Sequence, residues 1–189
     1  MTAPDLQPAR EAPVLLTLDP GLTATGYAIF RFPNPTQVTH SWEYFGSLYQ
    51  ASGTYYVPAG QLAGRLASLA AWTRELAHQY DPLMAFCEKP ATARIYWGRK
   101  PRDQSGEGAL NAADLALHHM ARGAILSALG HTCPVEEVTP GKFRKSARHQ
   151  LLPHIIKDLR KSSSHQRDAI SLALVILTDS RRSWRVKKA

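Results

Sequence analysis

The order of apolar and polar positions along the chain predicts alternating strands and helices. Residues 14–18 form a short apolar run, typical of a strand that is covered on both faces. The turn signal of Pro20 and Gly21 follows, and a second apolar segment then predicts a strand that pairs with the first. Leucines recur at helical spacing through residues 60–79, and another apolar run covers residues 83–87. Strand, helix and strand in this order predict a parallel crossover and therefore an α/β sheet.

The remaining pattern predicts further elements of both kinds. The aromatic-rich stretch at residues 42–48 is interpreted as a third strand, and residues 51–60, which hold Gly53, Pro58 and Gly60, as a connection. Beyond the second apolar run, the expected elements are a helix at 107–129, a short strand at 134–138, a weaker helix at about 150–160 and a final helix at 165–178. The final helix is apolar almost all round, which predicts that it is buried.

Length and composition indicate a single domain. The chain has 189 residues, 44% of them hydrophobic, enough for a substantial core. We expect a loose lead-in at residues 1–12, one folded domain at 13–180 and a basic tail at 181–189. The two cysteines, Cys87 and Cys133, lack metal-ligand spacing and favour a reducing compartment. No apolar run suggests a membrane span or secretory signal, so we expect a cytoplasmic protein of a bacterium or an infected host cell.

The charge of the chain indicates a polyanionic partner. The formal net charge is +8, and 17 of the 23 lysines and arginines fall in three segments that are nearly free of acids: the loop after Glu88, residues 142–161 and the tail. A solvated face would interleave acids with bases, so a phosphate-binding track is the better interpretation. The candidate DNA-binding residues are Lys89, Arg94, Tyr96, Trp97, Arg99, Lys100, Arg102, Lys142, Arg144, Lys145 and Arg148.

The aromatic pair Tyr96 and Trp97 stands among glycines and arginines, which is not the setting of core residues. Stacking of a base on an aromatic side chain contributes about 1–3 kcal/mol, so these two residues are candidates to contact bases. The alternative, that Trp97 folds back onto the domain, stays open.

Acidic residues stand where separate elements begin or end. Asp19 and Glu88 each close an apolar strand, and a carboxylate in that position is costly unless it is hydrogen-bonded or binds a cation. The ends of parallel strands meet at one edge of a sheet. His165 and Asp168 are three residues apart at the start of the final helix and therefore share a helix face. Packing of that helix on the sheet would bring all four side chains together.

Such a cluster predicts a site for Mg²⁺ or Mn²⁺, because gathered carboxylates stay ionised only with cations among them. Two such ions about 4 Å apart can activate a water and stabilise the leaving oxygen of a phosphodiester. Each residue also has an ordinary interpretation. Asp19 suits a turn, Glu88 a salt bridge with Lys89 or Arg94, His165 a cap or surface position, and Asp168 the positive end of the helix dipole.

These residues resemble a known family. Leu18-Asp19-Pro20-Gly21 with Thr25-Gly26-Tyr27 is similar to the first-strand motif of the RuvC-type Holliday junction resolvases, the crossover junction endodeoxyribonucleases. Glu88 matches their second acid, and the segment from His165 through Asp168-Ala169 looks like their final motif. Order and spacing agree over roughly residues 14–178.

The resemblance implies a ribonuclease H-like fold, with a mixed central sheet flanked by helices, and metal-dependent cleavage of DNA. It implies Asp19, Glu88, His165 and Asp168 as ligands of two Mg²⁺ or Mn²⁺ ions, with Asp19 bridging both, and Lys142, in preference to Lys145, near the scissile phosphate. It also implies a homodimer that cuts both strands of a four-way junction during DNA recombination and repair. Some members carry Asp in place of His165, and imidazole suits Mn²⁺ better than Mg²⁺, so the metal preference stays open.

Departures from the family pattern suggest a divergent, phage-encoded branch. The segment after Glu88 is longer and more basic than the bacterial enzymes lead us to expect, and residues 139–161 fit loosely. Parts of the sequence are compatible with two other functions. One is a branched-DNA-binding protein on the same fold without efficient catalysis. The other is an ATPase of the actin and Hsp70 class, which would need a second glycine-rich phosphate loop that the sequence lacks.

Overall fold

The computed structural model describes residues 13–32, 42–89, 112–139 and 161–178, together with Leu152 and Ile155. The strands are β1 (Val14–Asp19), β2 (Ala24–Arg31), β3 (Tyr49–Tyr56), β4 (Met84–Glu88) and β5 (Val135–Val138). The helices are α1 (Trp42–Leu48), α2 (Leu62–Tyr80), α3 (Ala112–Leu129) and α5 (Ser164–Thr178). None of the helices in these ranges is long and apolar enough to cross a membrane.

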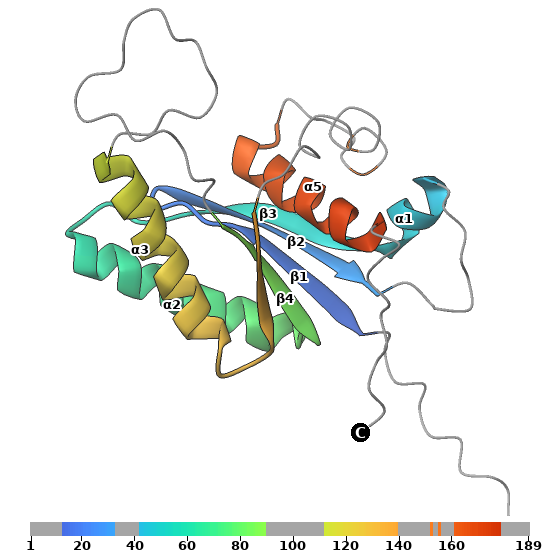
Figure 1. Cartoon of the computed structure of the whole chain (residues 1–189), viewed down its shortest axis with the longest axis horizontal. Coiled ribbons are helices and arrows are strands. Elements are labelled where there is room, and N and C mark those ends of the chain that lie inside the picture. The colour runs from blue at the N-terminus through green and yellow to red at the C-terminus, as the bar shows by residue number, and fades with distance from the viewer. Residues whose placement is uncertain are drawn as a thin grey trace, which may run out of the picture.

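The strands form one mixed sheet in the order β3-β2-β1-β4-β5 (Figure 1). β1 and β2 make an antiparallel hairpin in which Asp19 lies opposite Gly26, and β2 pairs antiparallel with β3. β4 runs parallel to β1, and β5 runs parallel to β4. The predicted hairpin, parallel crossover and mixed α/β sheet are therefore confirmed. As a consequence, the carboxyl ends of β1, β4 and β5 lie at the same edge of the sheet.

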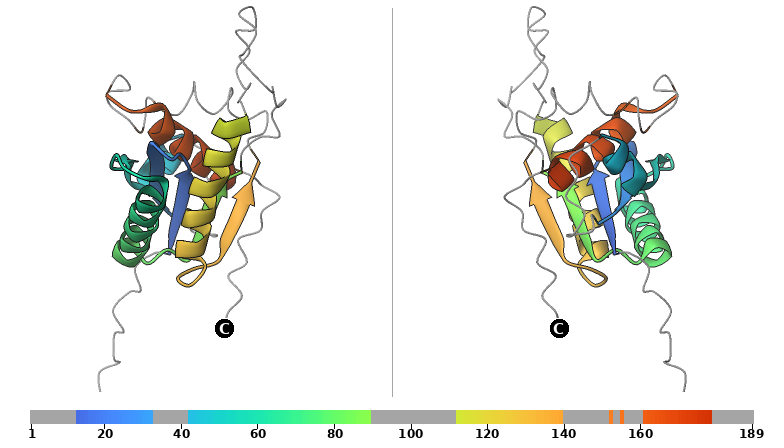
Figure 2. Two further views of the ribbon diagram at one scale, coloured as in Figure 1. Left: turned by 90° about the vertical axis from the view of Figure 1, so that its left-hand side faces the viewer. Right: turned by 90° about the vertical axis from the view of Figure 1, so that its right-hand side faces the viewer.

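Helices cover both faces of this sheet. Because side chains alternate along a strand, Leu15 and Phe86 contribute to a cluster under α5, whereas Leu16 and Leu18 contribute to a cluster under α2 and α3. Figures 1 and 2 show α5 with α1 beside it on one face, and α2 with α3 on the other. The apolar final helix is buried, as predicted, with eight of its side chains inside the fold.

The prediction for residues 42–60 is wrong. Residues 42–48 form helix α1, and the strand comes afterwards, at Tyr49–Tyr56, where the pattern predicts a connection. Phe45 and Leu48 are one helical turn apart and are both buried in the cluster under α5. β3 escapes prediction because it is an edge strand with half-buried residues such as Ser52, Gly53 and Thr54, so its pairing with β2 rather than its apolar content makes it a strand.

The other elements agree with the predicted ones to within a few residues. α2 ends at Tyr80, and Asp81 adopts a left-handed conformation with φ 42° before Pro82. α5 begins at Ser164, and the Ser163 hydroxyl caps it by accepting a hydrogen bond from the Gln166 amide at 3.0 Å. The predicted weaker helix at 150–160 lies largely outside the described residues, although Leu152 and Ile155 are helical. The lead-in and the basic tail also lie outside them.

Candidate functional site

Two buried carboxylates stand side by side at the carboxyl edge of the sheet. The last residue pair between the parallel strands β1 and β4 is Leu18 with Cys87. Asp19 and Glu88 are the next residues of these two strands. Only 8% of Asp19 and 7% of Glu88 is exposed. Neighbouring strands lie about 4.8 Å apart, and strand alternation directs both side chains to the face that α5 covers. The register thus places both acids at neighbouring strand ends, and their assignment to one site stays a prediction.

The first turn of α5 brings an imidazole to this pair. His165 Nδ1 lies 2.7 Å from Asp19 Oδ2, so the ring donates a hydrogen bond to the carboxylate. This bond raises the pKa of His165 above its ordinary value, against the opposing effect of burial. Asp168 lies one turn further along α5, and its Oδ1 atom is buried. Asp19 and His165 are thus in direct contact, although they are 146 residues apart in the chain.

The raised pKa of His165 predicts a pH-dependent contribution to the stability of the metal-free protein. The contribution is fully present below the ordinary imidazole pKa of about 6.5, and it is lost as the pH rises through the higher pKa of the folded state. Replacing His165 with Gln should therefore lower the free energy of unfolding more at pH 6 than at pH 9. The difference between the two destabilisations should be about 1 kcal/mol. Urea unfolding with a chelator present measures both values.

A matched control is His131→Gln, because His131 is exposed in the turn after α3. Burial raises the pKa of both cysteine thiols, and this effect is common to the wild type and both variants. A destabilisation by His165→Gln that is equal at the two pH values, or larger at pH 9, would contradict the prediction.

Close backbone packing sets the position of α5 over the sheet. A Cβ atom on Gly26 would lie 2.0 Å from the carbonyl oxygen of His165 and 2.7 Å from the Gln166 amide nitrogen. Only glycine leaves room for this approach. Thr17, on the neighbouring strand, donates a hydrogen bond from Oγ1 to the Ala169 carbonyl oxygen at 2.8 Å. Contacts with β1 and β2 therefore fix the position of the start of α5 on the sheet.

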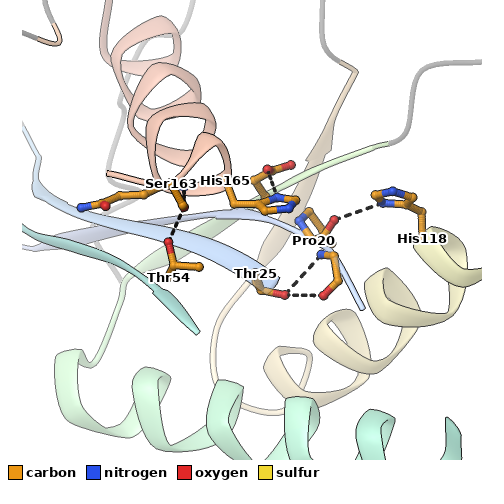
Figure 3. Close-up of polar contacts among 9 residues, drawn as sticks. Pro20, Thr25, Thr54, His118, Ser163 and His165 are labelled. Atoms are coloured by element: carbon orange, nitrogen blue, oxygen red, sulfur yellow. Dashed lines mark hydrogen bonds and ion pairs between the residues drawn. The ribbon is translucent and has the colours of Figure 1, made fainter. Parts of the chain in front are cut away.

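Hydroxyl and amide side chains tie the same turn of α5 to the edge strand β3. Ser163 and Thr54 share a hydrogen bond between their hydroxyls (Figure 3), and Gln166 Nε2 donates to Ser52 Oγ at 2.9 Å. These contacts explain why β3 carries small polar residues. They also keep the α5 start, and with it His165, at the end of β1.

The turn after Asp19 is held by its own polar contacts. The Thr25 hydroxyl donates to the Gly21 carbonyl oxygen at 2.9 Å and accepts from the Gly21 amide at 3.2 Å. His118 of α3 donates from Nδ1 to the Pro20 carbonyl oxygen at 3.3 Å. Figure 3 shows His118 and His165 on either side of Pro20. The sequence carries no signal for His118, because a histidine within a helix stands out only once the fold places it beside a site.

The donor set suits a divalent cation in its chemistry. Carboxylate oxygens are the ligands that Mg²⁺ and Mn²⁺ prefer, and an imidazole adds affinity for Mn²⁺. Two buried, adjacent carboxylates would also gain from a cation because their charges repel. In the part of the chain that the structure describes, however, no three His, Cys, Asp or Glu side chains are gathered closely enough to hold a metal ion. The assignment of Asp19, Glu88, His165 and Asp168 as ligands therefore stays a prediction.

Most of the predicted DNA-binding residues lie outside the described ranges, and so does Lys142. Of that set, only Lys89 is described: its side chain is exposed, and its amide donates to the Val138 carbonyl oxygen at 2.8 Å. This contact continues the pairing of β4 with β5 beyond Glu88. Lys89 is thus placed next to the proposed ligand Glu88, with its side chain open to solvent.

Comparison with known sequences gives two distant relatives with the same description. The chain is 25% identical over 173 residues to the crossover junction endodeoxyribonuclease RuvC of Histophilus somni, with 87% of this chain and 78% of the relative covered. It is 26% identical over 174 residues to the protein of the same name from Haemophilus ducreyi, with 88% and 77% covered. No model of a protein family matches the chain. Both relatives are bacterial, so a phage origin finds no support.

Comparison with solved structures shows the fold. Thermus thermophilus RuvC in complex with a Holliday junction substrate superposes with a TM-score of 0.57 at 16% identity, covering 86% of this chain and 90% of that one. The yeast mitochondrial Holliday junction resolvase Ydc2 superposes with a TM-score of 0.53 at 8% identity, covering 87% and 80%. The predicted ribonuclease H-like fold is therefore confirmed.

Proposed function

Because the chain is a distant homologue of the RuvC-type Holliday junction resolvases, we propose that it is a metal-dependent endonuclease that resolves four-way DNA junctions by paired incisions. The observation that carries the proposal is the position of Asp19 and Glu88 at neighbouring ends of the parallel strands, with His165 hydrogen-bonded to Asp19. DNA binding alone would not require acidic residues from strands far apart in the sequence to lie buried at the same edge of the sheet.

Asp19, Glu88, His165 and Asp168 would hold the divalent cations. When bound, such ions would supply an activated water and stabilise the leaving oxygen of the phosphodiester. The protein's own contribution is orientation. The β1–β2 turn holds the Asp19 carboxylate at the sheet edge, and the packing of α5 on Gly26 holds the His165 ring against it. Because both carboxylates are buried and largely removed from water, a bound cation would stabilise their negative charges.

A cleavage assay on a panel of DNA substrates tests the proposal. Four-way junctions, three-way junctions, flaps and linear duplexes are incubated with the protein and either Mg²⁺ or Mn²⁺. We expect symmetrical nicks in the two opposing strands of the four-way junction and none in linear duplex. Junction binding without nicking in either metal would instead favour the branched-DNA-binding alternative.

We further propose that α3 supplies the homodimer contact. Ala121 and Ala128 are buried within the protomer, where α3 packs on α2. A different face of α3 is exposed, and it combines small residues with a large apolar one: Ala113, Ala116, Met120, Gly123 and Ser127. Met120 is 46% exposed on this face.

Replacing Met120 with Glu should therefore convert a dimer to a monomer, because the new carboxylate would be desolvated at the contact. Light scattering measures the mass. Leu83→Glu is the matched control. Leu83 is also 46% exposed, but it lies directly before β4 and is not part of α3. A wild-type protein that is monomeric with and without DNA would count against paired incision by a dimer.

A further inference from the structure

A cleft opens beside the proposed catalytic pair, on the side of the β1–β2 turn that faces α2 and α3. Its volume is about 240 Å³, and its lining residues are Gly21, Leu22, Thr23, Arg65, Asp114, Leu117, His118 and His165. His165 thus borders both the cleft and the Asp19 carboxylate. A group that enters the cleft would therefore lie close to the proposed metal ligand His165.

Polar groups of opposite character converge in this cleft. The Arg65 guanidinium donates from Nη2 to the Leu22 carbonyl oxygen at 2.8 Å, while its buried Nε has no acceptor among the described residues. His118 uses Nδ1 on the Pro20 carbonyl oxygen, which leaves Nε2 for a second contact. Asp114, one turn before His118 on α3, adds a carboxylate to the lining.

The size and the walls of the cleft limit its occupant. Sites for drug-sized ligands measure roughly 300–1,000 Å³, so this one suits something smaller. Leu22 and Leu117 give it apolar walls, which suit a flat ring better than a phosphate. The Asp114 carboxylate would repel a phosphate but can accept a hydrogen bond from the amino group of a base. The guanidinium of Arg65 complements the acceptor atoms on the edge of a base.

We propose that this cleft receives a single unstacked DNA base from a nucleotide next to the cut phosphate, and so contributes to the choice of cleavage position. The proposal rests on the nuclease function proposed above. The centre of a branched DNA is where bases lose their stacking partners most easily, so the cost of extruding one is lowest there. Donor and acceptor groups within one small apolar cleft then favour some bases over others.

The test uses four-way junctions with the fluorescent base 2-aminopurine at successive positions around the crossover, and no divalent metal, so that no strand is cut. With the wild-type protein we expect fluorescence to rise at one position because the base there leaves the stack. Leu117→Phe fills the cleft and should abolish that rise while the junction remains bound, as measured by anisotropy. Arg65→Gln, a second variant of different size, should weaken the rise. Leu62→Phe, on the exposed start of α2, is the matched control and should behave as wild type.

Each outcome decides between the two proposals. A rise that persists in a folded Leu117→Phe protein overturns the role of the cleft and leaves the nuclease function untouched. If the wild-type protein binds no junction, the proposed function fails, and the cleft is tested separately by titrating the four deoxynucleoside monophosphates. NMR signals of the His118 ring should then shift in the wild type and not in Leu117→Phe. The absence of any shift would overturn the inference as well.

Discussion

Asp19→Asn should abolish cleavage of the four-way junction and leave junction binding intact. The amide keeps the shape of the side chain and still accepts a hydrogen bond from His165, but it lacks the negative charge that makes a carboxylate a strong ligand of a divalent cation. Loss of residues that merely support a metal ligand costs about 10–100-fold, so loss of the proposed bridging ligand should cost more than about 100-fold. Single-turnover cleavage rates and anisotropy-based binding, measured on the same junction, separate the two effects.

The matched control for this experiment is Asp81→Asn. It removes the same charge from the chain at the opposite edge of the sheet, and asparagine tolerates the left-handed conformation that Asp81 adopts. Cleavage by this variant should match the wild type. Wild-type cleavage by Asp19→Asn would remove Asp19 from the proposed metal site and with it the assignment of the nuclease centre.

Gly26→Ala should strongly destabilise the fold and also reduce cleavage in whatever protein remains folded. The added methyl group would meet backbone atoms of His165 and Gln166 at 2.0 to 2.7 Å, and the backbone of a helix packed on the sheet cannot rotate out of the way as a side chain can. Overpacking of a core typically costs about 1–3 kcal/mol, and we expect a loss at or above the top of that range. Urea unfolding at constant pH measures it.

Gly64→Ala is the control, because it makes the same substitution where nothing lies within 4 Å of the new methyl group. Gly64 is exposed in the first turn of α2, where alanine should stabilise the helix by up to about 0.5–1 kcal/mol, the range typical of a helix interior. The two glycine variants should therefore shift stability in opposite directions. If Gly26→Ala unfolds at the wild-type urea concentration, the close approach of α5 to β2 is not as the structure has it.

The two substitutions also separate chemistry from architecture. Asp19→Asn should retain the wild-type secondary structure, and its free energy of unfolding should stay within about 1 kcal/mol of the wild-type value, since it leaves the hydrogen bond with His165 possible. Gly26→Ala alters no charged group, yet it displaces the element that carries His165. A loss of cleavage in both variants, with a loss of stability only in the second, is the result expected if α5 serves to position its histidine.

The sequence by itself determined most of the elements and the candidate acids. The apolar runs of β1 and β4 are continuous because both strands are covered on both faces, and the leucines of α2 repeat at helical spacing because one face of α2 is buried. Each run ends in a carboxylate, a costly arrangement that is visible without a structure. The motifs around Asp19, Glu88 and His165 were sufficient to indicate the family.

Only the tertiary structure decided which residues meet. β3 became a strand through its hydrogen bonds to β2 and its contacts with α5, neither of which leaves a local pattern in Ser52 or Thr54. Gly26 stands in the sequence as part of the first-strand motif, and its contact with the His165 backbone depends on a helix that begins well over a hundred residues later. The cleft of Arg65 and His118 likewise draws on separate helices. Local patterns report the burial and geometry of neighbours in the chain, whereas these contacts depend on how distant elements pack.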